Sequence, residues 1–382
     1  MARRRRLGAN RDVEAAAFLR GEYQLSQAEI GVLLGGLSQS RVSRLLKLAE
    51  SRRLLDVRYR FLGADALSPE QLAELRSLIE PKELLDILGR FKSKTGVRVR
   101  EVRVVDTGGP GETPRSIEPR LARLGQGAAT RVGELLQRSS VFAVTWGQTL
   151  SYVIDALAAA PPRLDRPVTF VPVCAEPVAS SSNTETSSHL VQRLHQLLQP
   201  DAPPPPSLTG VPALIPLKFA DRDHTIRQFI EDAASYREIF KGPDPLIKRV
   251  DTLITSVGPA SRPMGFVHDE LLKAGSEPFK DPLTAAELAS LVAGDIGGIL
   301  IPRPGLQDKG RVNALNKMWT GIQREHLERI AIDADRNNHP GVIVVSLDRP
   351  EIVAEVIRQG LVNELIIDRA STLKVAQLLE RT

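Results

Sequence analysis

A cluster of basic and hydrogen-bonding side chains lies between residues 39 and 47, where each could contact a nucleic acid. Arg can donate two hydrogen bonds to guanine and Gln can pair with adenine, whereas Ser and Lys mostly contact phosphates. Their types and spacing therefore predict recognition of DNA through its major groove. The candidate DNA-binding residues of this cluster are Gln39, Ser40, Arg41, Ser43, Arg44 and Lys47.

Two further basic segments flank this cluster. Residues 57–61 alternate apolar and basic side chains, which predicts the strand of a winged helix with Arg58 and Arg60 facing the DNA backbone. The N-terminal arm Arg3–Arg6 could insert into a minor groove, and a solvated tail is the alternative.

A second set of candidate residues lies in four loops that follow predicted strands, at 146–149, 256–258, 294–298 and 346–349. Ligands of parallel sheets bind at the carboxyl ends of the strands, where helix N-termini favour anions. Turn glycines, a core position for Trp146 and a surface position for Arg349 are the alternatives to a binding site. The candidate effector-binding residues are Gly147, Gln148, Thr149, Gly258, Asp295 and Arg349.

Catalytic and metal-binding motifs are scarce. The sequence has no G-x-x-x-x-G-K-[ST] loop, no G-x-G-x-x-G fingerprint after a strand, no H-E-x-x-H and no G-x-S-x-G. The six His residues show no metal-ligand spacing, and His268 beside Asp269 is more typical of a loop than of a general base. Cys174 is the only cysteine, which excludes an intrachain disulfide and a multi-cysteine metal site. We therefore expect no catalytic residue, no metal and no cofactor.

Two short helices must position the DNA-binding cluster. Ser26 and Glu29 have the spacing of a capping box, Gly35-Gly36 allows a tight turn, and Ser38 is a good N-cap for the second helix. A plain helical hairpin with a solvated Arg face is the alternative, but the caps, the charge and the wing together favour a helix-turn-helix. The expected apolar face of the second helix, at i, i+3, i+4 and i+7, is Val42, Leu45, Leu46 and Ala49.

The remaining elements predict a linker and a large α/β domain. A helical linker starts at Ser68-Pro69, and its apolar stripe could either dimerise or pack against its own C-terminal domain. From residue 99, β-branched runs alternate with helical patterns, which favours βα units and a Rossmann-like, mostly parallel sheet. The predicted strands are Val102–Val105, Val141–Thr145, Val168–Val173, Ala213–Leu217, Thr252–Val257, Ile296–Ile301, Val342–Ser346 and Glu364–Ile367.

Length and charge agree with this division. The 382 residues exceed what one hydrophobic core supports, so we expect a winged helix-turn-helix at 1–62, the linker at 63–98 and an effector domain at 99–382. Residues 1–60 hold 13 basic and 6 acidic side chains, whereas the remainder holds 38 basic and 40 acidic ones. A concentrated positive charge attracts a polyanion, so the partner is expected to be double-stranded DNA. No membrane span or secretion signal is recognisable, and we expect a cytoplasmic protein.

Six segments occur in a characteristic order along the chain: the helix-turn-helix at 26–49, Val102–Val105, Thr145–Leu150, Gly294–Gly298, Gly360–Asn363 and Leu365–Asp368. With these motifs the chain resembles the SorC-type family of sugar-responsive transcriptional regulators over nearly its whole length. That resemblance implies a sensor domain with the fold of phosphosugar isomerases and glucosamine-phosphate deaminases. It also implies homodimers or homotetramers on palindromic operators.

Three positions depart from the family pattern. The turn at Gly35–Leu37 is one residue longer, and Gln148 replaces the usual Arg of a loop that resembles the family's phosphate contact. Leu347 and Asp348 replace small residues before Arg349, so steric bulk and a repulsive charge weaken the expectation of a phosphate group there.

The sequence therefore predicts a DNA-binding regulator whose operator affinity responds to a small carbohydrate, with a phosphosugar favoured. One alternative is a phosphosugar isomerase or deaminase with an accessory N-terminal domain, in which Asp295 would be the first catalytic candidate. Another is a degenerate sensor domain that serves only in oligomerisation.

Overall fold

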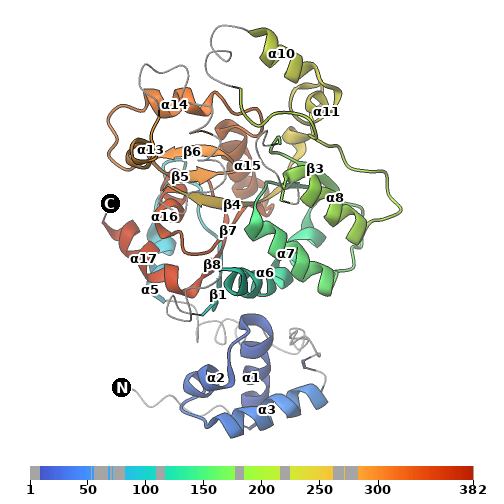
Figure 1. Ribbon diagram of the computed structural model, residues 1–382. Helices are drawn as coiled ribbons and strands as arrows, with labels where there is room; N and C mark the ends of the chain where they lie inside the picture. Colours follow the sequence, from blue (N-terminus) through green and yellow to red (C-terminus); the bar gives the residue numbers. More distant parts are fainter. Residues whose placement is uncertain are drawn as a thin grey trace.

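The computed structural model describes residues 9–52, 54–55, 68, 71, 82–108, 117–176, 185–215, 224–260, 271 and 283–381. Three N-terminal helices, α1 (Ala9–Tyr23), α2 (Gln27–Leu33) and α3 (Gln39–Ser51), form a small unit below a larger α/β domain (Figure 1). The predicted wing at 57–61, with Arg58 and Arg60, and the arm at 3–6 lie outside the described residues.

The small unit has an apolar core of its own. Ile30 from α2 and Val42 from α3 are fully buried, and Leu46 is 4% exposed, so α2 and α3 turn their apolar faces inward as the sequence pattern predicts. Leu45 is only partly buried and packs at the margin of this core. The predicted helix pair is confirmed, and it rests on a third helix, α1.

Two parts of the predicted linker lie within the described residues. The backbone N–H of Ser68 donates to Oε1 of Gln71 at 2.7 Å, and the N–H of Gln71 donates to Oγ of Ser68 at 3.3 Å, which is a capping box. Helix α5 (Lys82–Arg90) then buries its apolar stripe in the same core as α17 (Arg369–Glu380). Of the two uses expected for this stripe, packing against the C-terminal domain is therefore the one that the structure shows for α5.

The larger domain is built on a mostly parallel sheet, which confirms the predicted fold class. Its central strands run in the order β1-β8-β7-β4-β2-β3, and each neighbouring pair is parallel. This arrangement brings the carboxyl ends of β2, β4 and β7 to one edge. The strands are β1 (Glu101–Val105), β2 (Val141–Val144), β3 (Thr169–Pro172), β4 (Thr252–Pro259), β7 (Gly341–Ser346) and β8 (Glu364–Asp368).

Helices cover both faces of this sheet. On one face α6 (Glu118–Arg138), α7 (Gln148–Ala159) and α8 (Ser187–Leu198) share a core with the strands. On the other, α5, α15 (Arg324–Asn337), α16 (Pro350–Gln359) and α17 share the larger core. Further elements are α10 (His224–Asp232), α11 (Ala234–Tyr236), a π-helical turn (Arg237–Lys241), a 3-10 turn (Leu246–Arg249), α13 (Ala285–Leu291) and α14 (Gly310–Asn316).

Two of the predicted strands are wrong. The run Ile296–Ile301 is not one strand: it holds the last residue of β5 (Val292–Ile296), a turn at Gly297-Gly298 and most of β6 (Ile299–Pro302), which pairs antiparallel with β5. Gly297 and Gly298 take positive φ angles of 57° and 91° and reverse the chain there. The run Ala213–Leu217 forms no strand in its described part, where isolated bridges join Pro212 to Glu176 and Leu214 to Trp319. Pro212 and Pro216 lack the backbone N–H that a ladder needs.

No helix in the described ranges combines the length and apolar character that crossing a bilayer requires. Within the same ranges, no three His, Cys, Asp or Glu side chains gather in a way that could hold a metal ion.

Candidate functional sites

The first candidate site is the outer face of α3. Val42, Leu46 and Ala49 hold the helix to the small unit, so its opposite face is left for a partner. No acidic side chain occurs in the first turn of α3, and its dipole adds positive potential at that end. Of the six predicted DNA-binding residues of α3, all are exposed except Ser43, which is half-buried: Gln39, Ser40, Arg41, Ser43, Arg44 and Lys47.

Local hydrogen bonds fix the turn that presents α3. Ser26 and Glu29 form the predicted capping box, with the Ser26 N–H donating to Oε2 of Glu29 at 2.7 Å. Gly31 lies against the backbone carbonyl of Leu37, where a Cβ atom would overlap the oxygen. Ser38 occupies the N-cap position of α3, but its hydroxyl contacts Oγ of Ser40 at 3.1 Å instead of the helix backbone. The turn is therefore set by close packing as well as by its glycines.

Helix α1 was not predicted, although α3 packs on it. Its residues from Asp12 to Leu19 are almost all buried, so the helix has no polar face that would create a clear stripe in the sequence. Phe18 and Tyr23 meet edge to face with ring centroids 5.5 Å apart. The available signal was the run Ala15-Ala16-Ala17, whose residues have the highest helix propensity.

The second candidate site lies at the carboxyl edge of β2, β4 and β7. Gly147 is the N-cap of α7 with φ 117°, and Gln148 and Thr149 follow as the first residues of that helix. A Cβ atom on Gly147 would lie 3.2 Å from Oγ of Ser256 in β4, so the loop after β2 passes close to that strand. The Gly147 N–H donates to the carbonyl of Glu185 at 3.0 Å, while Gln148 stays exposed.

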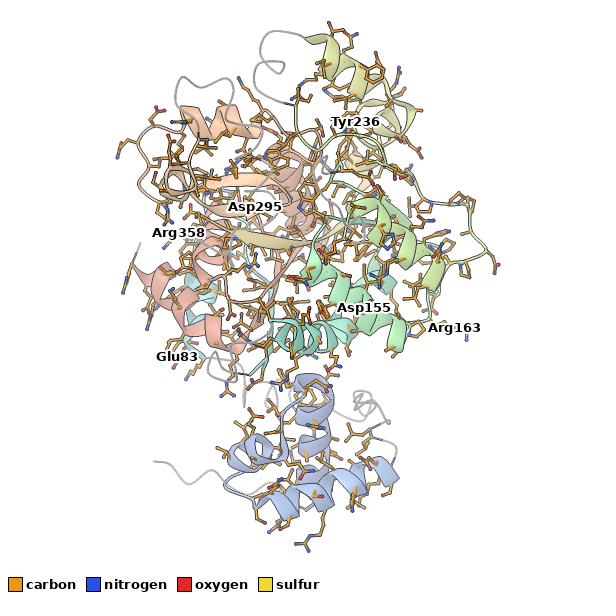
Figure 2. The ribbon with its side chains drawn as sticks, in the orientation of Figure 1. Glu83, Asp155, Arg163, Tyr236, Asp295 and Arg358 are labelled. Carbon is orange, nitrogen blue, oxygen red and sulfur yellow. The ribbon has the colours of Figure 1, made fainter. Side chains whose placement is uncertain are left out.

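Asp295 is the most unusual group of this site. It lies in β5, not in the loop that the sequence predicted, and it pairs with Gly258 of β4. Its side chain is inside the larger domain (Figure 2), where Oδ2 accepts a hydrogen bond from the Gly298 N–H at 3.2 Å. Oδ1 is buried and has no hydrogen-bond partner among the described residues. Burial raises the pKa of Asp295 to about 6, against the opposing effects of the Gly298 bond and the Arg349 charge.

Gly258 makes room for this carboxylate. A Cβ atom at that position would overlap Oδ1 of Asp295, so any other residue would displace the acid. Arg349, the N-cap of α16, reaches the same strand and donates from Nη1 to the Val257 carbonyl at 2.6 Å. Burial lowers the pKa of Arg349, and the charge of Asp295 opposes that effect. The structure thus brings Gly258, Asp295 and Arg349 together, with Gly147 one strand away.

The residues before Arg349 do not obstruct the site in the expected way. Leu347 is 3% exposed and belongs to the core shared with α6 and α7, so its bulk points into the protein. Asp348, with φ 57°, accepts two hydrogen bonds from the guanidinium of Arg120 on α6. Its charge is therefore neutralised by a residue that the sequence pattern did not single out, and the expected repulsion is offset.

Two tryptophans border the hairpin turn beside Asp295. Trp146 and Trp319 meet edge to face with ring centroids 5.9 Å apart, and a Cβ on Gly298 would lie within 3.5 Å of both rings. Trp146 is 8% exposed, which agrees with the core position considered for it. Among the described residues, the buried Nε1 of Trp319 and Oγ of Ser346 have no hydrogen-bond partner. Ser346 belongs to a loop that the sequence predicts for this site, whereas no sequence pattern marks Trp319 as a neighbour of the hairpin turn.

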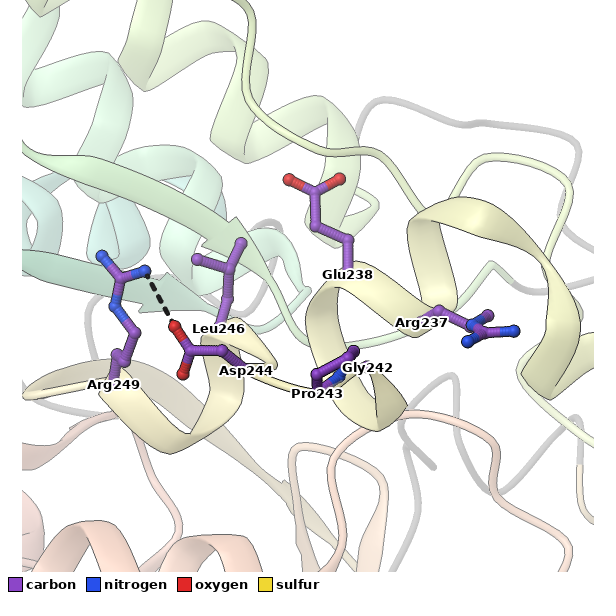
Figure 3. A pocket seen from close by; sticks show the side chains of 7 residues that line it. All are labelled: Arg237, Glu238, Gly242, Pro243, Asp244, Leu246 and Arg249. Carbon is purple, nitrogen blue, oxygen red and sulfur yellow. Dashed lines mark ion pairs between the residues drawn. The ribbon is translucent and has the colours of Figure 1, made fainter.

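A surface cavity of about 340 Å³ lies elsewhere, beside the π-helical turn. Figure 3 shows Arg249 paired with Asp244 on one side and Arg237 on the other. The 3-10 turn that contributes Arg249 directly precedes β4, so this cavity lies at the amino end of the strand. That is the opposite edge from the one where ligands of parallel sheets bind.

A family model described as "Putative sugar-binding domain" matches residues 85–277. The chain belongs to this sugar-binding domain family. The matched residues include the loop at 146–149 and strand β4 with Gly258.

Solved structures share the fold of this sugar-binding domain protein. The full-length sorbitol operon regulator SorC from Klebsiella pneumoniae is 20% identical, with a TM-score of 0.56 over 97% of this chain and 99% of that chain. A transcriptional regulator from Streptococcus pneumoniae TIGR4 is 17% identical, with a TM-score of 0.53 over 77% and 97%. A DeoR family transcriptional regulator from Listeria monocytogenes is 17% identical, with a TM-score of 0.52 over 76% and 99%. No curated protein sequence matches the chain. The family model confirms the sugar-binding domain, and these structures share the fold that the resemblance to SorC-type regulators implies.

Proposed function

We propose that this protein is a transcriptional regulator that binds operator DNA through α3 and whose DNA affinity is modulated by a small carbohydrate. One observation carries the proposal: a single chain joins an exposed, basic recognition helix to a domain of the sugar-binding family. A phosphosugar isomerase or deaminase would have no use for that helix.

At the DNA, Arg41 and Arg44 would contact guanine, and Gln39 would contact adenine. Ser40, Ser43 and Lys47 would hold phosphates, with Arg58 and Arg60 of the predicted wing on the DNA backbone. A homodimer or homotetramer would place two such helices on symmetric half-sites one helical turn or a multiple apart. Because the partner is DNA, we assign the protein to the cytoplasm.

At the effector site, Oδ1 of Asp295 would accept a hydrogen bond from a sugar hydroxyl, which relieves a buried acceptor that has no other partner. Gly147 and Thr149 at the start of α7, together with Arg349, would attract an anionic group. Gln148 offers a neutral amide where related chains have a cation. A phosphosugar is therefore the favoured effector, and an unphosphorylated sugar is the second candidate.

Selection of bound sequences from a random DNA pool tests the DNA-binding half of this proposal. We expect enrichment of a palindromic site whose half-sites are about one helical turn apart or a multiple of it. Repeating the selection with candidate sugars would show whether the effector raises or lowers operator affinity. If no sequence is enriched, the regulator hypothesis is wrong.

Thermal unfolding in the presence of phosphorylated sugars, unphosphorylated sugars and polyols tests the effector half. A ligand at 100 times its Kd should stabilise the folded protein by about 2.7 kcal/mol. If no sugar shifts the unfolding temperature, a sensor domain kept only for oligomerisation is the better explanation. Turnover of a phosphosugar that is lost in Asp295→Asn would instead favour the enzyme.

A further inference from the structure

An ion pair joins the small N-terminal unit to the large domain. Glu22, next to the last residue of α1, contacts the guanidinium of Arg103 in β1. The two side chains are only 9% and 5% exposed. The Arg103 guanidinium also lies over the ring of Tyr23, 5.2 Å from its centroid. Figure 1 shows α1 as the part of the small unit that lies against the large domain, below α6 and β1.

The surroundings of Arg103 make this contact more than a surface ion pair. Arg103 lies on an edge strand, on the face of the sheet that α6 covers. There Arg131 of α6 is already committed to Glu364 by hydrogen bonds of 2.8 to 3.0 Å. Removing one member of a buried pair leaves a charge without compensation, which is strongly unfavourable. Glu134 of α6 also places a negative charge near Arg103, and docking of α1 supplies the carboxylate that contacts its guanidinium directly. Separation of the two units would break that contact and expose both charges.

Helix α6 connects this contact to the effector site. Near its start, Arg120 holds Asp348, the neighbour of Arg349. In its middle, Gly125 packs on the backbone of Tyr152 in α7, where a Cβ atom would overlap the carbonyl oxygen. Gly127 lies against Val105 of β1, where a Cβ atom on Gly127 would be 2.6 Å from Cγ1 of Val105. The helix is thus wedged between α7, whose N-terminus faces the site, and the strand that carries Arg103.

We propose that the Glu22–Arg103 contact is a latch that fixes α1, and with it the recognition helix α3, against the effector domain. A change at the loops after β2 and β7 would act on DNA binding through α6 and this latch. The inference rests on the proposed function and adds its route of coupling. Because coupling between two binding sites is reciprocal, operator DNA must also alter the effector site.

The chain contains a reporter for this test. Its two tryptophans, Trp146 and Trp319, both lie beside Asp295 in the effector site. Intrinsic tryptophan fluorescence therefore reports on that site without an identified ligand. Operator DNA, taken from the random-pool selection, should change the emission of the wild type at saturation. In Glu22→Gln this change should be lost while DNA is still bound.

A matched control separates the latch from a general charge effect. Glu14→Gln makes the same substitution nearer the start of α1, and this variant should keep the full fluorescence change. Arg120→Gln removes the contact to Asp348 near the start of α6 and should also abolish the fluorescence change. It serves as a second variant if Glu22→Gln fails to fold. Circular dichroism would establish that each variant is folded, and fluorescence anisotropy of labelled DNA would establish saturation.

The latch is overturned if folded Glu22→Gln, saturated with DNA, shows the same emission change as the wild type. It is also overturned if the wild type binds DNA to saturation without any change. A wild type that binds no DNA overturns the proposed function itself, so the two failures are distinguishable.

Discussion

The proposed DNA-binding face of α3 and the proposed effector site differ in how their polar groups are held. On α3 the polar side chains point to solvent and are supported only by the apolar face behind them. In the effector site a carboxylate, a guanidinium and several glycines interlock, and one carboxylate oxygen is buried without a partner. Substitutions on α3 should therefore change binding and leave stability intact. Substitutions in the effector site should change both.

The largest effect is expected from Asp295→Asn. Burial raises the pKa of Asp295 from 3.8 to about 6, so between about pH 4 and 6 the folded protein binds this proton more tightly than the unfolded chain. The free energy of unfolding therefore falls as the pH rises through this window. Removing the charge should stabilise the folded protein at pH 7 by up to about 3 kcal/mol. Denaturant unfolding at pH 7 and pH 4 measures the difference.

The pH dependence supplies the control for Asp295→Asn. The stability gap between the variant and the wild type should shrink at pH 4, where Asp295 is protonated in the folded state. A gap of equal size at both values would mean that the buried charge is not its cause. The variant should also lose the stabilisation by sugars, because an amide cannot replace both carboxylate oxygens as acceptors.

The next effect is expected from Gly258→Ala. The added methyl group would overlap Oδ1 of Asp295, and overpacking of this kind costs about 1–3 kcal/mol. Gly89→Ala is the matched control, because a Cβ atom there has no neighbour within 4 Å and the helical position favours Ala. Thermal unfolding should show a loss of stability for the first variant and a small gain for the second. Equal effects would refute the close approach at Gly258.

A smaller effect, on binding alone, is expected from Arg44→Ala. The loss of one base or phosphate contact should weaken operator binding about tenfold, or 1.4 kcal/mol, with no change in the unfolding temperature. Arg163→Ala removes the same charge from an exposed position of the large domain and should leave operator affinity unchanged. Fluorescence anisotropy of labelled operator at moderate salt measures both. Unaltered affinity of folded Arg44→Ala would exclude α3 as the recognition helix.

The smallest effect is expected at the helix caps of the small unit. Ser26→Ala removes the hydroxyl that accepts from the Glu29 N–H and leaves the reciprocal bond from the residue 26 N–H to the Glu29 carboxylate, which should cost about 1 kcal/mol. Ser38→Ala is the control, since the Ser38 hydroxyl makes no bond to the helix backbone. Chemical denaturation should therefore distinguish the two alanines. If Ser38→Ala is the more destabilising, the assignment of the capping box as the main support of the turn is wrong.

These two regions also differ in how far the sequence predicts them. The helix-turn-helix follows from local rules: the capping box at Ser26, the turn at Gly35-Gly36 and the apolar spacing of α3 all involve neighbours in the chain. Helix α1 escaped the same rules because it is buried nearly all round and shows no periodic stripe. The periodicity of apolar residues therefore identifies the amphipathic helices α2 and α3 better than the buried helix α1.

In the large domain the sequence predicts six of the eight proposed strands and the edge where the candidate residues meet, but not how their side chains contact one another. Asp295 was expected in a loop and lies in a strand, because Gly297 and Gly298 fold the chain back into a hairpin. Asp348 and Leu347 were expected to hinder an anion, yet Arg120 and the core remove both obstacles. The outcomes for Leu347 and Asp348 depend on residues far away in the sequence, and so does the pairing of Asp295 with Gly258. Periodicity along the chain cannot supply such contacts.

The anchoring of Leu347 has a consequence for the rate of ligand binding. The Leu347 side chain anchors the loop at 346–349 in the core. The Asp348 carboxylate accepts from Arg120, and the Asp348 N–H donates to the carboxylate of Asp368. A ligand that binds at this edge contacts a loop that is already ordered, so the conformational entropy of the loop is lost during folding and not during association. We therefore expect one-step association kinetics, in which the observed rate constant rises linearly with sugar concentration and no slow phase of loop closure follows.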